Sequence, residues 1–142
     1  MKIARCRHEG KECYGILQLE RLLCLPALAK RLKRDLPVEI EVFIANQTAQ
    51  KTAETLLAEA QSRDLDAVSI PLNEARLLAP IASPPKILCL GLNFATHVTE
   101  TKEKQQEEPV IFMKPRSAIA GPNDKIIKRP FVKNLITKAN SL

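Results

Sequence analysis

The first apolar runs of the chain are short, and they predict a β-hairpin. Residues 2–7 and 13–17 are strand-like and flank a polar turn with a two-residue tip at 9–10. In a hairpin with this tip, paired residue numbers add up to 19. Cys6 is therefore expected directly opposite Cys13.

The pattern then changes to a helical period, and the first half of the chain continues as a mixture of helices and strands. Apolar residues at helical spacing predict a helix over 26–35 and another over 47–62, with Asn46 as the N-cap of the second. Between them, apolar residues alternate with other side chains over 38–45, which predicts a half-buried strand. A short strand is predicted near 67–70. We expect residues 1–76 to form a small N-terminal α+β domain.

A proline-rich connector near 80–85 separates this domain from a second unit, which we place at 77–142. The second unit is predicted to contain, in order, a continuous apolar strand at 86–90, a polar segment at 93–106, a buried strand at 110–114, a turn at 121–124 and a short strand at 126–127. We expect the two longer strands to expose apolar edges if they lack sheet partners.

The net charge of +6 is unevenly distributed: residues 1–76 carry +1 and residues 77–142 carry +5. The basic residues of the second unit are dispersed, aromatic residues make up only 4% of the chain, and no nucleic-acid-binding motif is present. We therefore expect no nucleic-acid partner. No apolar run reaches the length of a membrane span, and the N-terminus does not resemble a secretory signal, so we expect no membrane association and a cytoplasmic location.

The four cysteines, Cys6, Cys13, Cys24 and Cys89, show no Cys-x-x-Cys spacing. The pairing of Cys6 with Cys13 would allow a cross-strand disulfide or, together with His8, a weak metal site. In a cytoplasmic chain, two free thiols are the favoured interpretation.

Candidate chemistry follows the apolar strand at 86–90. On a helix, His97 and Glu100 would lie on one face at i and i+3 and would be able to form a hydrogen bond. A carboxylate paired with an imidazole raises its basicity, as water activation or proton abstraction beside a carbonyl requires. A solvent-exposed pair on a surface helix has the same spacing, so the spacing alone leaves both interpretations open.

Many fixed spacings in the second unit resemble those of the fumarylacetoacetate hydrolase family. That family shows an apolar strand, then Gly-x-Asn-Tyr/Phe-x-x-His-x-x-Glu, then Pro-x-x-Phe-x-Lys-Pro and a later Gly-Pro. This sequence contains, in the same order, Gly91, Asn93, Phe94, His97, Glu100, Pro109, Phe112, Lys114, Pro115, Gly121 and Pro122. The resemblance implies a mixed β catalytic domain that begins in residues 77–142.

The resemblance also implies an activity. It indicates a hydrolase, isomerase or decarboxylase that depends on Mg²⁺ or Mn²⁺ and acts on a 2-oxo acid: an acylpyruvate, oxaloacetate or a ring-cleavage product. His97 and Glu100 would form a catalytic dyad on a segment that orders over the substrate. Asn93 and Lys114 would bind substrate, although Lys114 is equally well explained as a solvated lysine at a strand end. A full-length member would be a homodimer.

The sequence departs from the family where the metal ligands are expected. Lys138 and Asn140 occupy the approximate positions of the family's Glu-x-Glu, and no acidic residue follows Asp124. A cation and an amide do not replace two carboxylates around a hard divalent ion, so we expect no metal ligand in this chain. We expect a truncated family member that is inactive alone; the alternative is a non-catalytic remnant that acts, if at all, as an interaction module.

Overall fold

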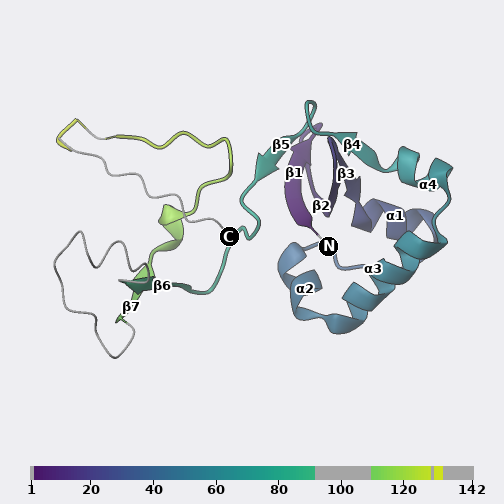
Figure 1. Ribbon diagram of the computed structural model, residues 1–142, viewed down its shortest axis with the longest axis horizontal. Coiled ribbons are helices and arrows are strands. Elements are labelled where there is room, and N and C mark those ends of the chain that lie inside the picture. Colours follow the sequence, from purple (N-terminus) through teal and green to yellow (C-terminus); the bar gives the residue numbers. More distant parts are fainter. Residues whose placement is uncertain (1, 92–109, 129, 133–142) are drawn as a thin grey trace.

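The computed structural model describes residues 2–91, 110–128 and 130–132, which form two separate β-sheets and several helices (Figure 1). The first sheet has five strands in the order β4-β3-β2-β1-β5, and the second consists of β6 and β7. This combination confirms the predicted α+β class.

The hairpin forms as the sequence predicts. It consists of β1 (Ile3–His8) and β2 (Lys11–Gln18). Cys6 is the register partner of Cys13, which confirms the predicted pairing. At the tip, Glu9 has a φ of 49° and Gly10 a φ of 77°. Two positive φ angles in succession are typical of a type I′ turn, whose twist matches that of the flanking strands.

Three further strands complete the first sheet. They are β3 (Arg21–Cys24), β4 (Ser69–Pro71) and β5 (Arg76–Leu78). β4 is predicted from the sequence, but β3 is not, because Leu22 and Leu23 run without interruption into the apolar residues of the following helix. β5 pairs with β1, so this strand crosses the boundary expected between residues 76 and 77.

The helices pack against one face of this sheet and bury a shared apolar core. They are α1 (Leu25–Arg31), α2 (Ile40–Ala45), α3 (Gln47–Glu59) and α4 (Ser62–Ala67). α1 and α3 confirm the two predicted helices. Asn46 caps α3 as predicted, because its Oδ1 accepts a hydrogen bond from the backbone N–H of Ala49 at 3.1 Å. None of the helices in the described ranges is long and apolar enough to cross a membrane.

The strand predicted over 38–45 is wrong, because residues 40–45 form α2. Ile40 and Phe43 are 3% and 0% exposed, whereas Val42, which alternation would place on the buried side with Ile40, is 47% exposed. Burial therefore follows the i, i+3 spacing of a helix. Phe43 packs against the ring of Tyr14 with a centroid separation of 5.0 Å, and this tertiary contact selects the helix over the strand.

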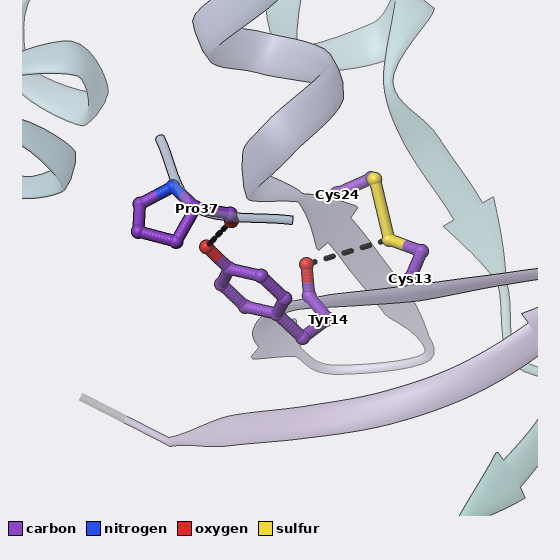
Figure 2. Close-up of a disulfide and its surroundings, with 4 residues drawn as sticks. All are labelled: Cys13, Tyr14, Cys24 and Pro37. Carbon is purple, nitrogen blue, oxygen red and sulfur yellow. Dashed lines mark hydrogen bonds between the residues drawn. A yellow bond between two sulfur atoms is a disulfide. The ribbon is translucent and has the colours of Figure 1, made fainter. Parts of the chain in front are cut away.

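Tyr14 joins the hairpin to the segment that precedes α2 (Figure 2). Its side chain is buried, and its hydroxyl donates a hydrogen bond to the carbonyl oxygen of Pro37 at 2.5 Å. Burial raises the pKa of Tyr14 to about 12, because the ionised phenolate would lose its hydration. The phenol therefore stays neutral and remains a hydrogen-bond donor at physiological pH.

The cysteine predictions are partly wrong. Cys13 and Cys24 form a disulfide between β2 and the end of β3 (Figure 2). Cys6 is a buried free thiol. Cys13 is thus neither free nor bonded to Cys6. His8 lies beside Glu74, with 3.6 Å between Nε2 and Oε2, and no cluster in the described part of the chain offers three or more metal-ligating side chains.

α4 is attached to α1 by an ion pair with a predictable pH dependence. Arg31 Nε donates to Asp64 Oδ1 at 2.7 Å, and this contact lowers the pKa of Asp64 below its usual value of 3.8. A depressed carboxylate pKa stabilises the fold above about pH 4, and that stability is lost as pH falls through the folded-state pKa. We expect Asp64→Asn to have a lower melting temperature than the wild type at pH 7. Below pH 3 the two melting temperatures should differ less, as measured by circular dichroism.

The matched control for this prediction is Asp66→Asn. Asp66 is 3.7 Å from Arg21, and its side chain is 75% exposed, so solvent screens the pair. This variant should melt like the wild type at both pH values. An equal decrease in the melting temperature of the two variants at pH 7 would contradict a specific role for Asp64.

The second sheet is exposed, in contrast to the buried strand predicted at 110–114. β6 (Ile87–Gly91) and β7 (Val110–Lys114) pair antiparallel, and every residue of β7 is exposed. Leu88 and Met113 are 62% and 68% exposed, so this sheet exposes large apolar side chains. The short strand predicted at 126–127 is not formed.

Candidate active site

The dyad predicted from the sequence lies outside the described residues. Asn93, His97 and Glu100 belong to the range 92–109, so their predicted roles stay predictions. The described strands do show where this range is attached. Gly91, the last residue of β6, is the register partner of Val110, the first residue of β7. The chain therefore leaves the small sheet and re-enters it at the same end.

Lys114 lies at the other end of this sheet. It is the last residue of β7, it is exposed, and its register partner is Ile87. Four residue steps separate it from Val110, which corresponds to about 13 Å along a strand. The described part of the chain therefore places Lys114 away from the point where 92–109 begins and ends.

The turn at 121–124, which the sequence predicts, is held by Asp124. The Oδ2 atom of Asp124 accepts a hydrogen bond from the N–H of Gly121 at 2.7 Å, and its Oδ1 lies 2.5 Å from Nη2 of Arg76. These contacts lower the pKa of Asp124 and keep it ionised. A side chain at Gly121 would approach the backbone nitrogen of Ala79 to 3.1 Å, so glycine allows the turn to pack closely on the chain after β5.

The N-terminal domain also holds the connector that leads to β6. Arg5 Nη1 donates to the carbonyl oxygen of Ala79 at 2.9 Å. Glu41 Oε1 accepts from the backbone N–H groups of Ala82 and Ser83 at 2.9 and 3.4 Å. Hydrogen bonds to the carboxylate lower the pKa of Glu41. These contacts fix the start of the segment that carries the small sheet.

This group of contacts is not predicted from the sequence. Glu41 falls within the strand predicted over 38–45, and about forty residues separate it from the connector, so no local signal links the two. The only available indication was the connector's proline content, which predicts an extended backbone with N–H groups available for external acceptors.

Comparison with known proteins assigns both parts of the chain. Residues 1–80 match the family described as Rv2993c-like, N-terminal, and residues 86–138 match the family described as Fumarylacetoacetate (FAA) hydrolase C-terminal. These two ranges cover the five-stranded sheet with its helices and the small sheet with its following turn, respectively.

Individual relatives match over a limited length. The chain is 48% identical over 59 residues to a fumarylacetoacetate hydrolase domain-containing protein 2 homolog of Dictyostelium discoideum, covering 42% of this chain and 19% of that protein. It is 44% identical over 61 residues to the mitochondrial oxaloacetate tautomerase FAHD2A of Bos taurus, covering 43% and 19%. It is 48% identical over 58 residues to protein Rv2993c of Mycobacterium tuberculosis, covering 41% and 22%.

The aligned part therefore spans about a fifth of the length of these relatives. The match to residues 86–138 agrees with the motif spacings around Gly91 and Lys114, and the match to residues 1–80 accounts for the domain that precedes them. The chain belongs to the fumarylacetoacetate hydrolase family and carries an Rv2993c-like N-terminal domain.

Proposed function

We propose that this sequence is part of an enzyme that acts on a 2-oxo acid, and that its reaction is a proton transfer beside the keto group. The main support for this proposal is the motif from Gly91 to Glu100, which lies inside the range 86–138 that matches the fumarylacetoacetate hydrolase family. Relatives that share this region bear the name oxaloacetate tautomerase. The range of substrates extends to acylpyruvates and ring-cleavage products.

The chemistry of a tautomerase agrees with the residue types in this motif. Interconversion of a keto acid and its enol moves a proton between a carbon and an oxygen atom, so it requires a group that accepts and donates protons near neutral pH. An imidazole supported by a carboxylate provides such a group. In this proposal His97 transfers the proton, Glu100 orients the imidazole and raises its basicity, and Asn93 and Lys114 bind the substrate.

The family implies a bound Mg²⁺ or Mn²⁺ ion, which polarises the keto group of the substrate when it is present. The described residues do not fit such an ion. After β7 the only described carboxylate is Asp124, and its two oxygens already accept from Gly121 and pair with Arg76. Hard divalent ions require about six oxygen ligands. We therefore derive no catalytic step through a metal bound to this chain.

This mismatch predicts that the 142-residue chain has no tight metal site. Titration with MgCl₂ or MnCl₂ in a calorimeter should give only the heat of dilution, and Asp124→Asn should behave identically. One saturable site of micromolar affinity or better would contradict the prediction. If the Asp124 variant lost that site, Asp124 would be identified as a ligand.

The proposed activity is tested by the conversion of enol-oxaloacetate to its keto form, followed as loss of ultraviolet absorbance. A protein that joins this sequence to a complete catalytic domain should accelerate the conversion, and the 142-residue chain alone should not. Failure of the longer protein on oxaloacetate, acylpyruvates and ring-cleavage products would refute the proposal. Activity of the short chain would refute only its proposed inactivity.

A second candidate function is a non-catalytic interaction module, and the apolar surface of β6 and β7 favours it. Phe112 and Ile111 are 43% and 61% exposed on a sheet of only two strands. If the longer protein has no activity while the short chain binds a partner through this sheet, the module is the better description. We further propose a cytoplasmic location and a homodimeric full-length protein, which cell fractionation and analytical ultracentrifugation test.

A further inference from the structure

Cys13 has a cysteine on each of the two strands beside it. It is bonded to Cys24 at the end of β3, with a Cα–Cα distance of 6.1 Å (Figure 2). On its other side Cys6 is its register partner in β1. The three cysteines therefore lie in a row across β1, β2 and β3.

The ladder places the Cα atoms of Cys6 and Cys13 at a separation that a disulfide can span. Leu17 donates its N–H to the carbonyl oxygen of Lys2 at 2.9 Å, and hydrogen-bonded pairs recur at every second position. Cys6 and Cys13 are thus a hydrogen-bonded pair, for which the Cα separation is about 5.5 Å. Residues directly opposite each other share a face of the sheet, and this separation lies within the range of disulfides.

The surroundings of the three sulfur atoms differ. Cys6 is completely buried, and burial raises the pKa of its thiol, so external reagents reach it poorly. Cys13 lines a cavity of about 520 Å³ between the hairpin, the start of α2 and the connector. Cys24 is only partly buried and directly precedes α1. A small thiol or disulfide therefore reaches Cys13 first, and Cys6 reaches it from inside the sheet.

We propose that Cys6, Cys13 and Cys24 form a thiol–disulfide exchange site in which Cys13 is the shared sulfur. The Cys6 thiol loses its proton as its sulfur attacks Sγ of Cys13, and over the whole step one proton passes from Cys6 to Cys24. The Cys6–Cys13 bond forms and the Cys13–Cys24 bond breaks; the electron pair leaves on Cys24, which takes up one proton, equal to the one that Cys6 loses. One disulfide and one thiol exist before and after the step, so no oxidant or reductant is consumed.

The exchange changes which elements are covalently joined. When Cys13 is bonded to Cys24, β2 is tied to the residue at which α1 begins. When Cys13 is bonded to Cys6, β2 is tied to β1, and the start of α1 is released with a free thiol at Cys24. The site therefore acts as a thiol–disulfide switch that couples or uncouples β2 and the start of α1.

The test follows alkylation of Cys24 in the 142-residue chain purified without reductant. Iodoacetamide is added, and unreduced peptides are mapped by mass spectrometry over time. We expect Cys24 to be alkylated as the peptide linking Cys6 and Cys13 accumulates. In Cys6→Ala the rate should fall at least about tenfold, because the internal attacking thiol is missing. Cys89→Ser removes the free thiol on β6. It should change neither the alkylation rate of Cys24 nor the accumulation of the peptide that links Cys6 and Cys13.

A second variant tests whether Cys6 and Cys13 can form a disulfide, and it leaves Cys6 unchanged. In Cys24→Ser combined with Cys89→Ser, oxidised glutathione should generate a Cys6–Cys13 disulfide and release two molecules of reduced glutathione per chain. Circular dichroism verifies that each variant is folded. The proposal is overturned if Cys6 and Cys13 both stay free thiols in this double variant, if Cys24 is alkylated equally fast in Cys6→Ala, or if the oxidised wild type contains no Cys13–Cys24 linkage.

Discussion

In a full-length enzyme that carries this N-terminal sequence, His97→Ala and Glu100→Gln should each lower kcat by about 10²- to 10⁴-fold, the usual range for lost general acid–base catalysis. KM should change much less, because the proposed role of the pair is to move a proton and not to hold the substrate. Steady-state kinetics with the enol form of a 2-oxo acid measures both parameters.

The control for this experiment is His8→Ala, because His8 is the only other histidine of the chain. His8 lies in the hairpin beside Glu74, far in sequence from the proposed dyad, and its removal should leave kcat unchanged. Melting temperatures are measured for all three variants. If His97→Ala and Glu100→Gln keep nearly full activity but melt earlier, the pair only stabilises the fold and the catalytic assignment is wrong.

Gly15→Ala should be among the most destabilising single substitutions in the N-terminal domain. A Cβ atom at this position would lie 1.8 Å from the carbonyl oxygen of Leu23 and 2.6 Å from its carbon. Both atoms are backbone, so the strand itself has to move and the pairing of β2 with β3 is disturbed. Overpacking against rigid neighbours costs roughly 3–5 kcal/mol in severe cases, a large share of the stability of a small domain.

Gly10→Asn is the matched control for Gly15→Ala. Gly10 has no atom within 4 Å of the position of a new Cβ, and asparagine tolerates the positive φ of the turn. This variant should lose less than about 1 kcal/mol. Urea unfolding, followed by circular dichroism, gives the unfolding midpoint of each variant. Similar midpoints would show that the sheet accommodates a side chain at residue 15.

Local signals were sufficient to predict the hairpin, α1 and α3. The two-residue tip at 9–10 fixes both the turn type and the register, so the pairing of Cys6 with Cys13 follows from arithmetic. The cap at Asn46 is likewise a contact between neighbours in sequence. The motif from Gly91 to Glu100 identified the family because its spacings are linear features that need no folding information.

Predictions failed where long-range contacts decide the structure. The alternation over 38–45 suits a strand, but packing of Phe43 on Tyr14, twenty-nine positions earlier, selects a helix. The bond between Cys13 and Cys24 depends on β3, which local periodicity did not separate from α1. β7 was predicted to be buried because its residues are apolar, yet in the described part of the chain only β6 pairs with it.

The pairing of Gly91 with Val110 has a consequence for evolutionary variation. Because the ladder already brings these two residues together, the entropic cost of closing the intervening segment rises only slowly with its length, by about 0.6 kcal/mol for each doubling. Insertions and deletions between the two anchors can therefore accumulate without shifting the register of β6 and β7. The number of residues between Gly91 and Val110 can therefore change while the two-stranded scaffold stays the same.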